Sequence, residues 1–221
     1  MKQTIVWLTS IWIMAIGILV AKEHIPKLEK GEVRFPSLKS YQMQDFDLAW
    51  PVHYFEIETY AVDPQFKLKK DISPDRIMQV GSVKMNQKRQ KERIWLSKAI
   101  LKKSYFWKRQ LPLLNDYRFT ILRFIDKSGH FKAIETLKEL RQMLGSINTP
   151  AELHLWIFAS ERLYMEPYSF KKTGKLYRVR FRMSSFCSYE ERFRYYNTNG
   201  DVIKNKNIRK IVKKNCEEPV I

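Results

Sequence analysis

Acidic residues, glycine and cysteine are all scarce in this chain. Its 221 residues include 23 Asp and Glu against 41 Lys and Arg, which gives a formal net charge of +18. Seven glycines and nine prolines are too few for a collagen-like or low-complexity chain. The two cysteines form no CxxC pair, which argues against a cysteine-based metal site.

Catalytic motifs are also absent. The histidines show neither HxxxH nor HExxH spacing, the serines lack a GxSxG context, and the chain has no phosphate-binding loop. Two acidic doublets, Asp45-x-Asp47 and Glu56-x-Glu58, have no third ligand, and in a strand such residues simply share a face. We therefore expect no catalytic residue, no metal site and no cofactor.

Positive charge and apolar side chains are abundant. Hydrophobic residues make up 44% of the chain and aromatic residues 14%, which is enough to build a core and argues against wholesale disorder. The net charge of +18 exceeds the roughly 2–8 units that keep a small domain soluble. Such a charge attracts anions, which include anionic lipid surfaces, acidic proteins and nucleic acids.

The first 21 residues contain no charge between Gln3 and Ala21, and they are mostly apolar. Lys2 followed by an apolar run is the layout of a secretory signal peptide. The run is also long enough, at about 30 Å as a helix, to cross a membrane, and Trp7 and Trp12 favour such an anchor. Residues 1–21 are thus expected to be a signal peptide or a membrane anchor. The rest of the chain would lie in a bacterial periplasm, either cleaved and soluble or anchored in the inner membrane.

The remaining sequence predicts an α+β fold. Residues 22–50 lack a sustained period and are expected to be a linker or an extended arm. Residues 51–166 are expected to form an α+β region, with strands over 52–62 and 117–126 and helices over 86–110, over 131–145 and from Pro150 onward. Thr149 and Glu152 form a capping box at the start of the last helix. Residues 167–221 predict an antiparallel β-meander that belongs to the same domain.

A row of arginines is the most specific feature of the meander. In "LYRVRFRM", Arg178, Arg180 and Arg182 alternate with apolar residues, so a strand places the three guanidinium groups on one face. Hairpin turns are expected at Thr173-Gly174 and Asn199-Gly200. The candidate residues for binding a polyanion are Arg178, Arg180, Arg182, Arg192, Arg194 and Tyr195. The alternative is a solvated sheet face screened by Glu190 and Glu191. If the row binds a polyanion, replacing its three arginines by glutamine should weaken binding and leave the fold intact.

The two cysteines flank the last predicted hairpin. In an exported protein Cys187 and Cys216 are expected to form a disulfide, which would close the meander and contribute about 3–4 kcal/mol.

The predicted helix 86–110 is a second basic surface. Plotted at 100° per residue, Lys91, Lys98, Lys102 and Arg109 are expected on one stripe, with Trp95 in a broad opposite sector. Lysines beside aromatic residues could rest on an anionic bilayer. The alternative is a helix whose apolar sector packs into the core beneath a charged outer face.

These features together favour a non-enzymatic, exported accessory or structural protein of the bacterial cell envelope. Its partner would be an anionic surface or an acidic envelope protein, with possible contact to the inner membrane. One alternative is a nucleic-acid-binding protein, either periplasmic in DNA transfer or cytosolic. Another is an envelope enzyme with an unfamiliar site.

Overall fold

The computed structural model describes residues 27–63, 65, 67, 74–103, 108–111, 116–161, 166–184 and 188–212. Residues 32–221 form one compact unit, distinct from residues 1–31. The expected signal peptide or anchor at 1–21 lies outside the described residues, so both alternatives stay predictions. None of the helices in the described ranges is long and apolar enough to cross a membrane.

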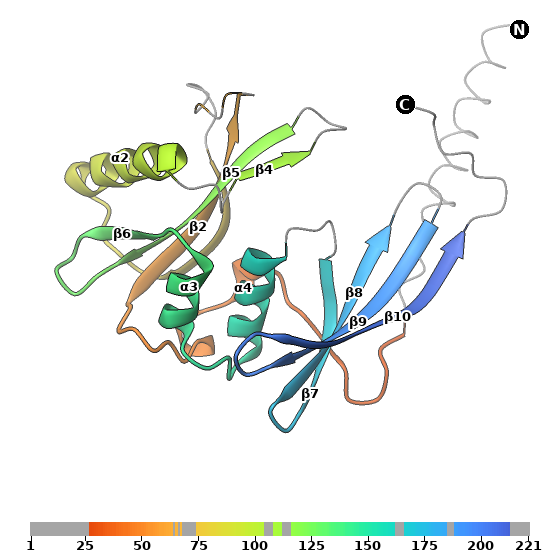
Figure 1. Cartoon of the computed structure of the whole chain (residues 1–221). Coiled ribbons are helices and arrows are strands. Elements are labelled where there is room, and N and C mark those ends of the chain that lie inside the picture. Colours follow the sequence, from red (N-terminus) through yellow and green to blue (C-terminus); the bar gives the residue numbers. More distant parts are fainter. Residues whose placement is uncertain are drawn as a thin grey trace, which may run out of the picture. The chain divides into compact units, whose positions relative to one another are not determined.

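The described residues form a mixed α+β fold of two antiparallel sheets and three α-helices, which confirms the expected fold class (Figure 1). The meander sheet has the order β1 (Val33–Arg34), β7 (Glu166–Thr173), β8 (Leu176–Ser184), β9 (Ser188–Asn197) and β10 (Val202–Val212). The β2–β5 sheet has the order β3 (Asp75–Gly81), β2 (Tyr54–Val62), β5 (Asp116–Ile125) and β4 (Lys108–Leu111), with β6 (Phe131–Ile134) also paired to β5. The helices are α2 (Gln87–Lys103), α3 (Leu137–Leu144) and α4 (Pro150–Ser160), and the 3-10 turns are η1 (Leu38–Ser40) and η2 (Met43–Asp45).

The expected β-meander is present, because β7, β8, β9 and β10 are neighbours in sequence order. Both predicted turns contain a glycine with positive φ, 59° at Gly174 and 78° at Gly200. The second turn is also held from outside, since Trp156 Nε1 on α4 donates a hydrogen bond of 2.8 Å to the Gly200 carbonyl oxygen.

Helix α4 begins as its sequence predicts and is buried on almost every side. The Thr149 hydroxyl accepts from Glu152 N–H at 3.2 Å, and the Glu152 carboxylate accepts from Thr149 N–H at 3.0 Å, which confirms the capping box. Leu155 packs with the β2–β5 sheet, whereas Leu153 and Ile157 pack with the meander sheet. The helix is apolar all round because it contributes to two hydrophobic clusters.

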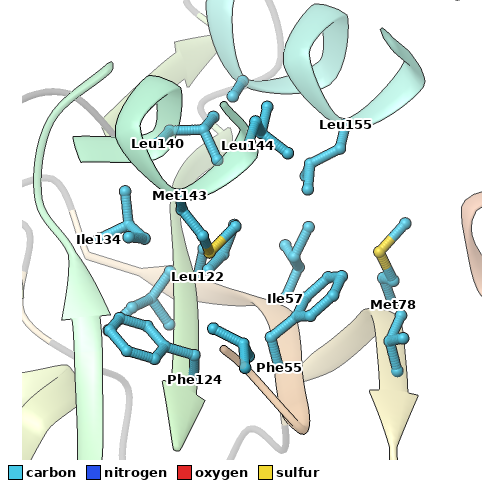
Figure 2. Close-up of a cluster of buried hydrophobic side chains, with 14 of the residues drawn as sticks. Phe55, Ile57, Met78, Leu122, Phe124, Ile134, Leu140, Met143, Leu144 and Leu155 are labelled. Atoms are coloured by element: carbon cyan, nitrogen blue, oxygen red, sulfur yellow. The ribbon is translucent and has the colours of Figure 1, made fainter. Parts of the chain in front are cut away.

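The larger cluster includes residues on both faces of the β2–β5 sheet, Leu122 on the α3 side and Ile121 on the α2 side. Figure 2 shows Leu140, Met143 and Leu144 of α3 facing Leu122 of β5, with Leu155 of α4 beside them. All five side chains are fully buried. Packing of this kind, rather than helix propensity, stabilises a helix as short as α3.

Two of the predicted helices have different bounds in the structure. The segment 131–145 divides into β6 and α3, because residues 131–134 pair with β5 and Thr136 forms a capping box with Glu139. In the segment 86–110 the described helix is α2, Gln87–Lys103, and Lys108–Leu111 pairs with β5 as strand β4. In both segments, pairing with β5 overrides a helical pattern.

The orientation of α2 also differs from the expectation. Its inner face consists of Arg93, Ser97, Ile100 and Leu101, whose side chains are buried or nearly so. Trp95 is 67% exposed, on the same side as the lysine stripe rather than opposite to it. The expected placement of Trp95 opposite the lysine stripe is therefore wrong, whereas Ile100 of the same sector is buried as expected.

Residues 32–50, within the stretch expected to be a linker or extended arm, pack against the fold. Strand β1 pairs with β7, and Tyr41 is buried in the larger cluster together with Leu38, Phe46 and Trp50 at its margin. The Tyr41 hydroxyl also lies 3.4 Å from His154 Nδ1 on α4.

His154 should make the stability of the protein depend on pH. Burial lowers its pKa from 6.5 to about 4, so the folded protein binds this proton less readily than the unfolded chain. The stability due to neutral His154 is therefore present above pH 6.5 and is lost as the pH falls toward 4. Between pH 6.5 and pH 4, the free energy of unfolding should fall by about 3 kcal/mol more in the wild type than in His154→Leu. Urea denaturation at each pH measures the difference. Equal declines in both proteins would contradict the assignment.

Candidate anion-binding face

One face of the meander sheet collects basic side chains from four strands. In β8, Tyr177, Val179 and Phe181 are fully buried in the smaller hydrophobic cluster, so the predicted alternation is correct and the arginines take the other face. The cross-strand register adds further residues to that face. We call this set the basic face: Arg34, Lys171, Arg178, Arg180, Arg182, Lys204 and Lys206.

Two arginines of the row bind a carboxylate of the same chain. Arg178 Nη2 lies 3.0 Å from Glu32 Oε1, and Arg180 Nη2 lies 2.9 Å from Glu32 Oε2. The Glu32 side chain is 1% exposed, and those of Arg178 and Arg180 are 21% and 6% exposed. Pairing of the short edge strand β1 with β7 brings Glu32 to Arg178, 146 residues away in sequence.

Glu32 was not predicted as part of this site. In the sequence, Glu32 is simply an acidic residue just before Val33-Arg34. Nothing local indicates that this short strand joins the meander. Glu191, which was expected to screen the row, lies opposite Arg182 in the register and 4.0 Å from Arg180. Because Arg180 is buried against a carboxylate, the three arginines are not equivalent, and the expectation that all three can be replaced without affecting the fold is revised.

Aromatic rings lie between the cations of the basic face. The guanidinium carbons of Arg178 and Arg180 lie 4.4 and 5.2 Å from the centroid of the Phe193 ring. Lys204 Nζ on β10 lies 5.9 Å from the centroid of Tyr195. These cation–π contacts hold the charged groups over the sheet. Of the seven residues of the basic face, Arg34, Lys204 and Lys206 are exposed.

The six candidate binding residues do not share one face. Arg192 and Arg194 lie opposite Phe181 and Val179 in the register, on the side of the sheet that faces α4. Arg192 Nε donates to Glu190 at 2.8 Å. Arg194 forms an ion pair with Glu161, which also accepts from Tyr196 Oη at 2.8 Å. Both arginines are therefore engaged within the fold, and Tyr195 stays with the basic face.

The Glu56-x-Glu58 doublet forms part of a buried charge cluster beneath α2. We use this name for Glu56, Glu58, Arg93 and Arg123. Arg123 Nη2 lies 2.9 Å from Glu56 Oε1 and also pairs with Glu58, while Arg93 Nε lies 2.6 Å from Glu56 Oε1. Burial by itself would raise the pKa of Glu56, but the charges of Arg123 and Arg93 lower it below its usual value. Both carboxylates are committed to arginines.

The other acidic doublet is also used structurally. Asp45 Oδ2 accepts from Gln42 N–H at 2.7 Å in the cap of η2, and Asp47 Oδ2 accepts from Asn148 Nδ2 at 3.2 Å. Within the described ranges, no three histidine, cysteine or acidic side chains come together as a metal site would require. Cys187 and Cys216 lie outside these ranges, so the disulfide stays a prediction.

Comparison with known proteins adds no relative. No family model matches this chain, and neither a curated protein nor a solved structure shows significant similarity to it.

Proposed function

We propose that this protein is an exported, non-enzymatic accessory component of the bacterial cell envelope, which binds an acidic protein partner on the basic face of the meander sheet. The sequence of residues 1–21 supports the proposed export and envelope location. The choice of partner follows from the charge and the geometry of the basic face.

Glu32 is the observation that supports a carboxylate-bearing partner. The short strand β1 adds to β7 at the edge of the sheet, and Glu32 just before it delivers a carboxylate to two guanidinium groups, at 3.0 and 2.9 Å. Strand addition is a common way for a sheet to bind an extended peptide. An acidic segment of another protein can make the same kind of contact with the exposed cations, because arginine and lysine both pair with carboxylates.

The exposed cations allow the proposal to be tested without touching the buried arginines. The variant Arg34→Gln/Lys204→Gln/Lys206→Gln removes three exposed charges from the basic face. We expect its affinity for labelled poly-glutamate at low salt to fall about tenfold or more, since three screened contacts of several tenths of a kcal/mol each add up to that amount. Its melting temperature should stay close to that of the wild type. Fluorescence anisotropy over a salt series measures the binding.

A matched variant separates a specific face from net charge. Lys39→Gln/Lys127→Gln/Lys138→Gln removes the same charge from exposed positions on η1, the turn before β6 and α3. It should bind poly-glutamate as the wild type does. Equal weakening in both variants would show that net charge alone drives binding. Tighter binding of a single-stranded oligonucleotide, lost in the basic-face variant, would assign the face to nucleic acid and overturn the proposal.

A further inference from the structure

The outward face of α2 combines an exposed tryptophan with lysines. Trp95 is 67% exposed and Ile94 is 49% exposed, which is unusual for large apolar side chains. Lys91 precedes Trp95 by four residues, and Lys98 and Lys102 follow it by three and seven. Helical geometry therefore places all three lysines around Trp95. All three lysines are exposed. We call these five residues the α2 outer face.

The inner side of α2 is fixed, which determines what the outer face presents. Arg93 pairs with Glu56 and Glu58, and the Ser97 hydroxyl accepts a hydrogen bond of 2.5 Å from Arg123 Nη1. Ile100 and Leu101 complete the buried side. Because charged, polar and apolar contacts all hold this side down, Trp95 cannot turn inward without breaking the buried charge cluster.

The charges on α2 only partly favour the helix itself, since Lys102 and Lys103 in its last turn suit the helix dipole but the remaining charges do not. The first turn contains no acid, and Lys88 lies there against the helix dipole. Lys98 and Lys102 are four residues apart and repel each other. Glu92 is the one acid of the helix, and it lies 3.0 Å from His130 Nδ1. No ion pair joins the three lysines of the outer face to an acid in the described part of the chain, so an external negative surface would relieve their repulsion.

We propose that the α2 outer face binds an anionic phospholipid surface. The amphipathic indole ring of Trp95 favours the headgroup region, where Ile94 can be withdrawn from water beside it. The surrounding lysines can reach lipid phosphates, as on helices that lie in the membrane interface. The aliphatic Ile94 next to the indole suits acyl chains better than stacked bases. This inference rests on residues separate from the basic face and is independent of the proposed partner there.

Quenching of Trp95 fluorescence by brominated phospholipids tests the proposal in the full chain. The chain has six tryptophans, so the Trp95 signal is taken as the difference between the wild type and Trp95→Phe. We expect quenching in vesicles that contain phosphatidylglycerol and little in vesicles of phosphatidylcholine alone. Lys91→Gln/Lys98→Gln/Lys102→Gln should remove that quenching and lower the charge-dependent partitioning on the order of 100-fold. Circular dichroism would check that each variant is folded.

The controls separate this face from other membrane contacts. Lys39→Gln/Lys127→Gln/Lys138→Gln carries the same charge loss and should retain Trp95 quenching. Vesicle binding through residues 1–21 alone does not require Trp95 to contact lipid. Quenching of Trp95, rather than vesicle binding, therefore reports on the α2 outer face. Vesicle binding with no Trp95 quenching, or equal quenching in both lipid compositions, would overturn the proposal. Stronger Trp95 quenching by a single-stranded oligonucleotide than by anionic vesicles would assign the face to nucleic acid instead.

Discussion

Replacing Arg123 by methionine is expected to lower the free energy of unfolding by about 3–5 kcal/mol, because it leaves buried carboxylates without their main partner. Arg123 is fully buried and contacts Glu56 at 2.9 Å, and it also pairs with Glu58. Its other amino group donates to Ser97 Oγ at 2.5 Å and to the Arg93 carbonyl at 3.1 Å. One side chain therefore joins strand β2, strand β5 and helix α2.

Urea denaturation of the variant and of a matched control measures this effect. Arg118→Met changes an arginine on the same strand whose side chain is 47% exposed, and it should cost no more than about 1 kcal/mol. Adding Glu56→Gln and Glu58→Gln to Arg123→Met should recover part of the loss, since the uncompensated charges are then gone. A loss of stability that the two glutamines do not reduce would show that packing, rather than charge, is responsible.

The loss should also depend on pH. In the wild type the lowered pKa of Glu56 stabilises the folded protein above about pH 4.5, and this contribution is lost as the pH falls. Without Arg123, burial acts on Glu56 with less compensation, so its pKa rises and its ionised form destabilises the fold at neutral pH. The difference between Arg123→Met and the wild type should therefore narrow as the pH is lowered toward 4. A constant difference would contradict the charge argument.

Glu32→Gln is expected to lower the free energy of unfolding by about 2 kcal/mol, because a hydrogen-bonded charge is removed from between two guanidinium groups. The loss should be smaller than at Arg123, since Glu191 remains 4.0 Å from Arg180 and Phe193 still contacts both arginines. The same change should strengthen binding of poly-glutamate, because it removes a negative charge that competes with an external carboxylate for Arg178 and Arg180. Thermal denaturation and fluorescence anisotropy measure the two effects.

Asp75→Asn is the matched control for Glu32→Gln. Its carboxylate is 77% exposed and lies 4.0 Å from Arg118, so the change should alter stability by less than about 0.5 kcal/mol and leave poly-glutamate binding unaltered. If Glu32→Gln were equally neutral, the Glu32 contacts would not hold β1 on the sheet. If it destabilised the fold without strengthening binding, Glu32 would be a structural residue only, and the support it lends to a carboxylate-bearing partner would be lost.

Much of the local structure could be predicted from the sequence. The capping residues Thr149 and Glu152 identify the start of α4, and the glycines at 174 and 200 identify two hairpins. Strict alternation in β8 correctly separates the arginines from the buried Tyr177, Val179 and Phe181. These features depend on neighbouring residues, whose preferences can be recognised without knowledge of the fold.

Sequence periodicity was less reliable where two interpretations compete. Residues 131–134 continue the helical pattern of α3 but pair with β5, and Thr136-x-x-Glu139 marks the true helix start within the predicted helix. Trp95 was assigned to a core-facing sector, although its spacing of four, three and seven residues from Lys91, Lys98 and Lys102 already puts it beside the lysine stripe at about 100° per residue. The helix buries Arg93 and Ser97 instead. A hydrophobic pattern does not anticipate a helix that packs on charged and polar side chains.

The sequence by itself determined the α+β class, the meander, the excess of positive charge and the alternation of the arginine row. Only the tertiary structure decided how these arginines are paired, because strand pairing brings Glu32 to Arg180 and to Arg178, which is 146 residues away in sequence. It also placed Arg192 and Arg194 on the opposite face, since cross-strand register rather than proximity in sequence selects which side chains share a surface. Local preferences are contained in short segments, whereas ion pairs between distant strands exist only after the sheets have formed.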